Sequence, residues 1–222
     1  METLSLDIGS LTRLQISNLV HWLVAPRPIA WVSTVGGDGR PNLAPFSFFN
    51  VFASHPPTVG VGPGSRNGVN KDSLRNIRET GELTISVVTA ELATRVNRTS
   101  AELDPTVSEW ELAGVTPRES VTVRPASVAE SPAALECRVF TIVDLGPDDL
   151  PTNSLVIARV THMHVSEEVV VGDGYELDPA ALDLVARMGG NLWCTTRERF
   201  ELIRPTVEEA TAELAATRRR NG

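Results

Sequence analysis

Cysteine is scarce in this sequence, and its scarcity excludes several kinds of site. Only Cys137 and Cys194 are present, far apart along the chain. They are too few and too widely spaced for a cysteine metal site or a C-x-x-C redox pair. We therefore expect both to be reduced residues that serve in packing.

Long apolar runs and excess positive charge are also lacking. No segment approaches the roughly 20 apolar residues that cross a bilayer. The start, METLSLDIGS, has no basic region followed by an apolar one, so we expect no secretory signal and a cytoplasmic location. The formal net charge of −8 argues against nucleic acid and anionic membranes as partners. The basic run Arg218–Arg220 is short and terminal, and we interpret it as a solvated tail.

Familiar catalytic motifs are absent as well. The sequence has no G-x-G-x-x-G after a predicted strand, no P-loop, no H-E-x-x-H and no G-x-S-x-G. The sequence therefore contains no recognisable catalytic motif for hydrolysis or phosphoryl transfer. A chain with pocket-forming residues and no positioned nucleophile is what a protein needs when a cofactor performs the reaction.

Histidine is rare, and one pair has a spacing that a metal ion can use. His162 and His164 are two positions apart on a predicted strand, so they share one face of the sheet. No third ligand occurs nearby in the sequence, and a site normally needs at least three protein ligands. We therefore expect no metal site.

The most informative stretch runs from Arg27 to Asn50. Ile29 to Val35 is rich in β-branched and aromatic residues, and the glycine-rich turn after it predicts a hairpin. In the second strand Pro45 cannot donate to a sheet ladder, so this segment is an edge, a bulge or a strand exit. Backbone amides left open there, beside a serine and aromatic rings, suit a planar ligand. Arg27 lies between two prolines and is held extended.

Residues 70–81 are predicted to form a helix. Asn70 is the expected N-cap, and Gly81 is the expected stop. Free amides at the helix start, with Lys71 and Ser73, indicate an anion site. The alternative is that Lys71 is simply solvated.

The length of 222 residues favours one domain, and other patterns outline its remaining elements. Residues 103–122 look like a surface excursion, which is long enough to suggest a function or a partner contact. Glycines 60 and 62 indicate close approach by a ligand or, equally, a crowded corner of the sheet. The other predicted helices cover residues 14–25 with Ser17 as cap, 91–99, 179–188 with Asp178 as cap, and 206–220; the other predicted strands cover 58–62, 83–88, 134–143, 154–164 and 168–171.

Four motifs in order give the sequence a family resemblance. RPIAWVST, DGRPNLAPFSFFN, the pair Pro56-Pro57 and NKDSLRNI together resemble the flavin reductase-like proteins, over about Val20 to Pro205. The resemblance implies a mainly β fold with peripheral helices, a split β-barrel of Greek-key type. We assign residues 1–205 to this domain and residues 206–222 to a C-terminal helix and basic tail.

The resemblance also implies roles for individual residues. Ser33, Thr34, Ser47 and Phe48 are expected to line the flavin, and Lys71 and Ser73, or alternatively Arg27, to take its phosphate. The candidates that approach the reacting ring are Asn97, His55 and Trp193, the last two being departures from the usual family pattern. The full set of expected cofactor-binding residues is Arg27, Ser33, Thr34, Ala44, Pro45, Phe46, Ser47, Phe48, Asn50, Ser54, Lys71, Ser73, Thr99 and Ser100.

The activity that the resemblance implies is an FMN-dependent NAD(P)H:flavin oxidoreductase, with FAD as the other cofactor. The family binds flavin at the interface of a homodimer, and some members supply a partner monooxygenase. Two alternatives remain: a protein that retains FMN and acts on a specific organic substrate, and a non-enzymatic carrier of flavin or haem.

Overall fold

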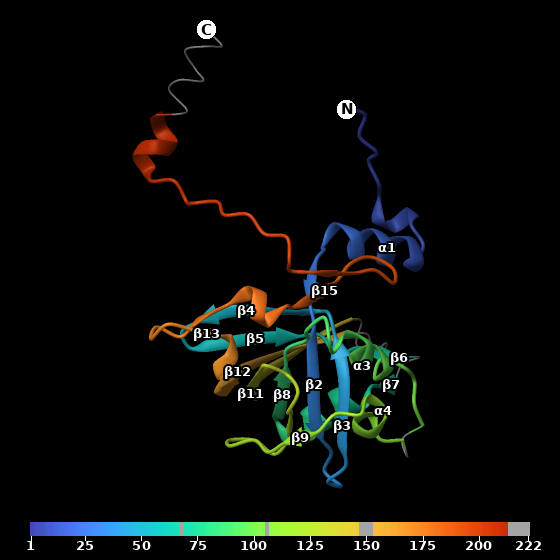
Figure 1. Ribbon diagram of the computed structural model, residues 1–222. Coiled ribbons are helices and arrows are strands. Elements are labelled where there is room, and N and C mark those ends of the chain that lie inside the picture. Colours follow the sequence, from blue (N-terminus) through green and yellow to red (C-terminus); the bar gives the residue numbers. More distant parts are fainter. Residues whose placement is uncertain (67–68, 105–106, 147–152, 213–222) are drawn as a thin grey trace.

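The computed structural model of the protein describes residues 1–66, 69–104, 107–146 and 153–212. Its centre is an antiparallel sheet of seven strands (Figure 1). In order across the sheet, the strands are β3 (Pro41–Phe46), β2 (Ala30–Val35), β8 (Glu82–Ser86), β11 (Ala133–Leu145), β12 (Asn153–Val165), β5 (Pro57–Val61) and β4 (Phe49–Ser54).

The two edge strands are consecutive in the chain, and this forces the sheet to close. Only Ser47 and Phe48 connect the end of β3 to the start of β4. Such a link spans at most about 11 Å, whereas the edges of a flat sheet of this size would lie roughly 29 Å apart. The backbone N–H of Gly62 donates to the Phe48 carbonyl at 2.7 Å and fixes the corner. The predicted split-barrel fold is confirmed.

Two hydrophobic cores occupy the two faces of the sheet. Neighbouring residues of a strand point to opposite faces, so Val32 packs inside the barrel whereas Trp31 packs outside it. The inner core also receives Leu74 and Ile77 from α2 (Asp72–Thr80). Helix α2 therefore covers one opening of the barrel and is held there by its apolar stripe.

The outer core corrects the expectation that residues 103–122 are a surface excursion. α4 (Glu109–Ala113) lies in this segment, and its Trp110 is 7% exposed. Trp110 packs with Trp31 and with Val96 of α3 (Ala93–Arg98). Because it contributes to a core, at least this part of the segment is structural.

Helix boundaries differ from the predicted ones by one or a few residues. The N-cap of α2 is Lys71 rather than Asn70, whereas Gly81 ends the helix in the left-handed region (φ 69°), as expected. α1 (Arg13–Leu23) begins with a capping box between Thr12 and Gln15, so Ser17 is not its cap. α5 (Pro179–Leu182) has the predicted cap, Asp178, but it is a single turn.

Two predicted segments have a different structure. The sequence of residues 51–57 predicts a rigid connection, but residues 51–54 belong to β4 and Pro57 begins β5. Residues 183–188 were expected to be helical, but they contain β15 (Val185–Arg187), which pairs with β1 (Arg27–Pro28) and with β16 (Trp193–Thr195). The remaining short elements are η1 (Ile8–Ser10), β6 (Ser65–Arg66), β7 (Val69–Asn70), β9 (Pro117–Arg118), β10 (Ser127–Val128), η2 (Glu167–Val169), β13 (Val170–Val171) and β14 (Glu176–Leu177).

The C-terminal segment leaves the barrel and extends away from it (Figure 1). Residues 207–212 are helical, which agrees with the predicted C-terminal helix. The rest of that helix and the Arg218–Arg220 tail lie outside the described residues. Across the described parts of the chain, no helix combines the length and the apolar character needed to cross a membrane.

Candidate functional site

The corner where the barrel edges meet is flanked by the start of α2. Lys71, the N-cap of the helix, holds its ammonium group 5.7 Å from the centre of the Phe46 ring. Ser73, in the first turn, accepts a hydrogen bond from the Asn42 amide at 2.9 Å. The proline-containing strand end and the cationic helix start, which the sequence analysis singled out separately, are therefore neighbours.

Two cavities lie beside this contact, and Pro45, Phe46 and Lys71 line both of them. The first, here called the cationic cavity, has a volume of about 250 Å³. Its lining residues are His21, Arg27, Pro45, Phe46, Ser47, Phe48, Gly62, Gly64, Ser65, Lys71, Asn153, Arg187 and Gly190. Among these described residues there is no carboxylate, so the cavity concentrates positive charge in a chain that is acidic overall.

Arg27 is fixed in the wall of the cationic cavity by carbonyl groups alone. Its Nη1 donates to the carbonyls of His21 (2.6 Å) and Val24 (2.7 Å), and its Nη2 donates to that of Met188 (2.9 Å). The side chain is 8% exposed, and its buried Nε has no hydrogen-bond partner among the described residues. A buried charged donor of this kind is costly unless a ligand satisfies it.

The pKa values in the cationic cavity reflect its unbalanced charge. Burial, and after it the charge of Arg187, lower the pKa of the Arg27 guanidinium. Burial, followed by the charges of Arg27 and Arg187, likewise lowers the pKa of His21. Cationic groups whose pKa falls in this way are stabilised when an anion binds between them.

The second cavity, here called the helix-start cavity, has the opposite character. Its volume is about 270 Å³, and besides Lys71 it is lined by the carboxylates of Asp72, Glu102 and Glu109. Burial, assisted by the charge of Asp72, raises the pKa of the Glu109 carboxyl group. The remaining lining residues are Asn42, Ala44, Pro45, Phe46, Ser73, Thr99, Ser100, Ala101 and Leu103.

Comparison with known proteins identifies the family. The model of the flavin reductase-like domain matches residues 24–176. An uncharacterized protein of Halalkalibacterium halodurans is 38% identical over 93% of this chain and 99% of its own length. This protein belongs to the flavin reductase-like family.

Two solved structures resemble this flavin reductase-like chain over about nine tenths of its length. Nitrilotriacetate monooxygenase component B from Bacillus cereus is 32% identical, with a TM-score of 0.87 over 91% of this chain and 100% of its own. The 2-nitrobenzoate 2-nitroreductase of Pseudomonas fluorescens is 27% identical, with a TM-score of 0.80 over 92% and 98%.

Most of the cofactor-binding residues expected of a flavin reductase-like protein lie at the two cavities. Arg27, Ser47 and Phe48 line the cationic cavity only, and Pro45, Phe46 and Lys71 line both. The residues that line only the helix-start cavity are Ala44, Ser73, Thr99 and Ser100.

Four expected residues line neither cavity. Ser33 and Thr34 are buried in β2, where Thr34 accepts a hydrogen bond from the Asn76 amide at 3.1 Å. Asn50 and Ser54 are exposed on β4. The family motifs predict a cofactor-binding role for these four residues, but in the single chain none of them lines either cavity.

The three candidates for the reacting ring also stand apart from the cavities. Asn97 is exposed on α3, and His55 is exposed in the turn between β4 and β5. Trp193 lines neither cavity, but its ring lies 5.3 Å from the guanidinium of Arg187, which lines the cationic cavity.

Several residues of the cationic cavity were not predicted from the sequence. Arg187 was assigned to a helix, which concealed its place on β15 next to Arg27. Gly60 and Gly62 were interpreted as signs of a ligand or of a crowded corner; both positions are crowded, and Gly62 also lines the cationic cavity. A Cβ atom at Gly60 would meet the Phe52 ring at 2.4 Å, and one at Gly62 would meet Phe48 Cβ at 3.0 Å.

Proposed function

We propose that this chain is an FMN-dependent NAD(P)H:flavin oxidoreductase whose flavin phosphate binds in the cationic cavity. The observation that carries the proposal is that Arg27, Lys71 and Arg187 all line the cationic cavity, whose described lining residues include no carboxylate. When bound, the flavin accepts a hydride from reduced nicotinamide and passes the electrons to an acceptor. The protein supplies binding, orientation and electrostatics.

The charges favour the cationic cavity over the helix-start cavity for the phosphate. A dianionic phosphate gains from arginine and lysine donors and is repelled by nearby carboxylates. Arg27 contributes a fixed positive charge to the wall of the cationic cavity, because its guanidinium is held by three carbonyl groups and its Nε is buried. We therefore give Arg27 the phosphate-binding role together with Lys71, and leave Ser73 to its bond with Asn42. The same cavity accepts the first phosphate of FAD.

The corner at residues 44–48 suits the flat end of the cofactor. β3 pairs with β2 on one side only within the described sheet, so alternate backbone groups on its other side face outward. Pro45 has no N–H to offer, and Ser47 adds a hydroxyl group. We propose that the backbone N–H groups that face outward at residues 44–48 donate hydrogen bonds to the polar edge of the flavin ring. The same bonds would stabilise the negative charge on the ring after reduction.

A homodimer is part of the proposal. Each cavity is smaller than the roughly 300–1,000 Å³ typical of ligand pockets. Large apolar side chains are exposed on the elements around the corner, including Trp22 (51%), Val51 (65%) and Phe52 (61%). We propose that a second copy covers them and completes the flavin site, with its own copies of the residues that line neither cavity here.

The test is to mix the purified protein with NADH or NADPH and FMN under air. We expect FMN-dependent oxidation of the nicotinamide, followed as loss of its absorbance band. Omission of FMN from protein freed of flavin is the control. If the rate with FMN equals that without protein, the proposed activity is wrong. Similarity to component B of a monooxygenase supports a partner monooxygenase as the consumer of reduced flavin.

The similarity to a nitroreductase favours a second candidate function. In that case FMN stays bound and the protein reduces a specific organic substrate. A yellow protein that keeps its flavin through gel filtration and turns over free flavin slowly supports this candidate. Colourless protein that reduces added FMN rapidly supports the first. A flavin or haem spectrum without nicotinamide oxidation indicates the non-enzymatic alternative.

A further inference from the structure

A second cluster of chemically active side chains lies away from both cavities. Glu136 is on β11, and His162 is its register partner on the adjacent β12. His164 follows two residues later on the same face of β12, and its Nε2 lies 2.6 Å from Glu136 Oε1. The third ligand that the sequence analysis found missing is therefore supplied by the neighbouring strand.

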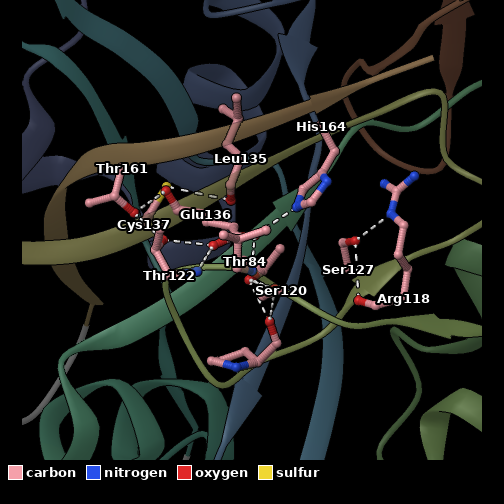
Figure 2. A network of polar contacts seen from close by, with 12 residues as sticks. Thr84, Arg118, Ser120, Thr122, Ser127, Leu135, Glu136, Cys137, Thr161 and His164 are labelled. Carbon is pink, nitrogen blue, oxygen red and sulfur yellow. Dashed lines mark hydrogen bonds and ion pairs between the residues drawn. The ribbon is translucent and has the colours of Figure 1, made fainter. Parts of the chain in front are cut away.

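The Glu136 carboxylate is held in a fixed orientation. Its Oε1 accepts the Val121 N–H at 2.7 Å, and its Oε2 accepts both the N–H and the hydroxyl of Thr122, each at 2.6 Å (Figure 2). The side chain is fully buried. Three hydrogen bonds thus hold the Glu136 carboxylate as an oriented oxygen ligand.

The two histidines complete a set of donor atoms. One ring nitrogen of His162, one of His164 and a Glu136 oxygen all lie within 4.8 Å of one another. The ring centres of the histidines are 5.0 Å apart, and both rings are partly exposed to solvent. Among the described residues, no hydrogen bond occupies either nitrogen of His162. Its ring is therefore available to a ligand that arrives from solvent.

We propose that Glu136, His162 and His164 bind a divalent cation of the zinc class. Two imidazoles and one carboxylate are a donor set that Zn²⁺ takes readily, with water completing its coordination. The ion replaces the proton between His164 Nε2 and Glu136 Oε1, and His164 then carries its proton on Nδ1. The bonds from Val121 and Thr122 remain and orient the carboxylate, as outer partners of metal ligands do.

The ion would cross-link two neighbouring strands, because Glu136 lies on β11 and both histidines lie on β12. The hydrogen bonds from residues 121–122 would continue to hold the Glu136 carboxylate. None of its three ligands lines the cationic cavity or the helix-start cavity. We therefore expect the ion to raise thermal stability and to leave flavin binding unchanged.

The test is a calorimetric titration of tag-free, chelator-treated protein with ZnCl₂. We expect saturable binding of one ion per chain and a rise in the melting temperature. His162→Ala and His164→Ala should each weaken binding by about tenfold or more. The matched control is His55→Ala, which removes an exposed histidine outside the cluster and should bind as wild type does.

A Co²⁺ titration reports which atoms coordinate. Four-coordinate cobalt gives strong visible bands, and we expect them in wild type and not in His162→Ala. Glu136→Gln should also lose them if circular dichroism shows that it folds; if it does not fold, the two histidine variants decide. The proposal is wrong if wild type shows no saturable zinc binding below millimolar concentration, or if His162→Ala binds zinc as tightly as wild type.

Discussion

At the scale of single residues, the charge in the cationic cavity depends on a few side chains. Arg27 is immobilised by three carbonyl groups, whereas Lys71 reaches the cavity from the start of α2. Lys71 is also the only lysine in the sequence. Its contribution can therefore be measured by substitution and by chemical labelling of a single amine besides the N-terminus.

Lys71→Ala should weaken FMN binding by about 1 to 3 kcal/mol, the value of a charge-assisted hydrogen bond in a partly buried site. Flavin fluorescence titration measures the change. Arg75→Ala is the control, because Arg75 lies on the same helix, pairs with Asp72 at 2.6 Å and lines neither cavity. Equal losses of FMN affinity in the two variants would show that Lys71 acts only through the overall positive charge of the chain and not through a contact with the phosphate.

Gly189 is a single residue on which the wall around Arg27 depends. A Cβ atom there would lie 2.2 Å from the Trp22 ring of α1. Gly189→Ala should displace α1, remove carbonyl acceptors from Arg27 and lower stability by about 1 to 3 kcal/mol, together with FMN affinity. Gly174→Ala is the control, since a Cβ atom there meets nothing within 4 Å. Denaturant unfolding and flavin titration of both variants test this, and an unperturbed Gly189→Ala would contradict it.

At the scale of elements, local patterns predicted most strands and several caps. Alternation identified β8, β11 and β12, and Gly81 and Asp178 were identified from helix-end chemistry. Pairing between distant segments was not predictable in this way. β15 is a strand because it lies between β1 and β16, and its local sequence reads equally well as helix. For the same reason the partnership of Glu136 with His162 is visible only once β11 and β12 are paired.

The role of α4 gives a prediction at this scale. Trp110→Ala should lower the free energy of unfolding by about 3 to 5 kcal/mol, as expected for a large side chain removed from a core. Leu112→Ala, two residues away and 37% exposed, should cost much less. Chemical denaturation of both variants measures the difference. A loss below about 1 kcal/mol in Trp110→Ala would restore the interpretation of this segment as a surface excursion.

At the scale of the whole molecule, the family motifs predicted the fold, and most of the cofactor-binding residues predicted from the family resemblance lie at the cavities. The motifs did not predict which of two adjacent cavities carries the positive charge, because Arg187 and His21 come from elements outside those motifs. The C-terminal segment is exposed throughout residues 198–212, and Phe200 (89%) and Ile203 (80%) lie on it. A segment of this kind is more typical of an assembly than of an isolated chain.

We therefore predict a dimer in solution. Light scattering during gel filtration should give about 48 kDa, twice the chain mass of 24.0 kDa. Removal of residues 199–222 should weaken the dimer, because it removes exposed apolar side chains that a partner would cover. Elution of the full chain at 24.0 kDa at all concentrations tested would contradict the proposed second copy.

The most direct test of the proposed function compares FMN with riboflavin, which has the same ring and lacks the phosphate. If the cationic cavity binds the phosphate, wild type should bind FMN about tenfold or more tightly than riboflavin, since each 1.4 kcal/mol is a factor of about ten. The preference should shrink in Lys71→Ala. Equal affinity for the two flavins in wild type, or an undiminished preference in Lys71→Ala, would contradict the assignment.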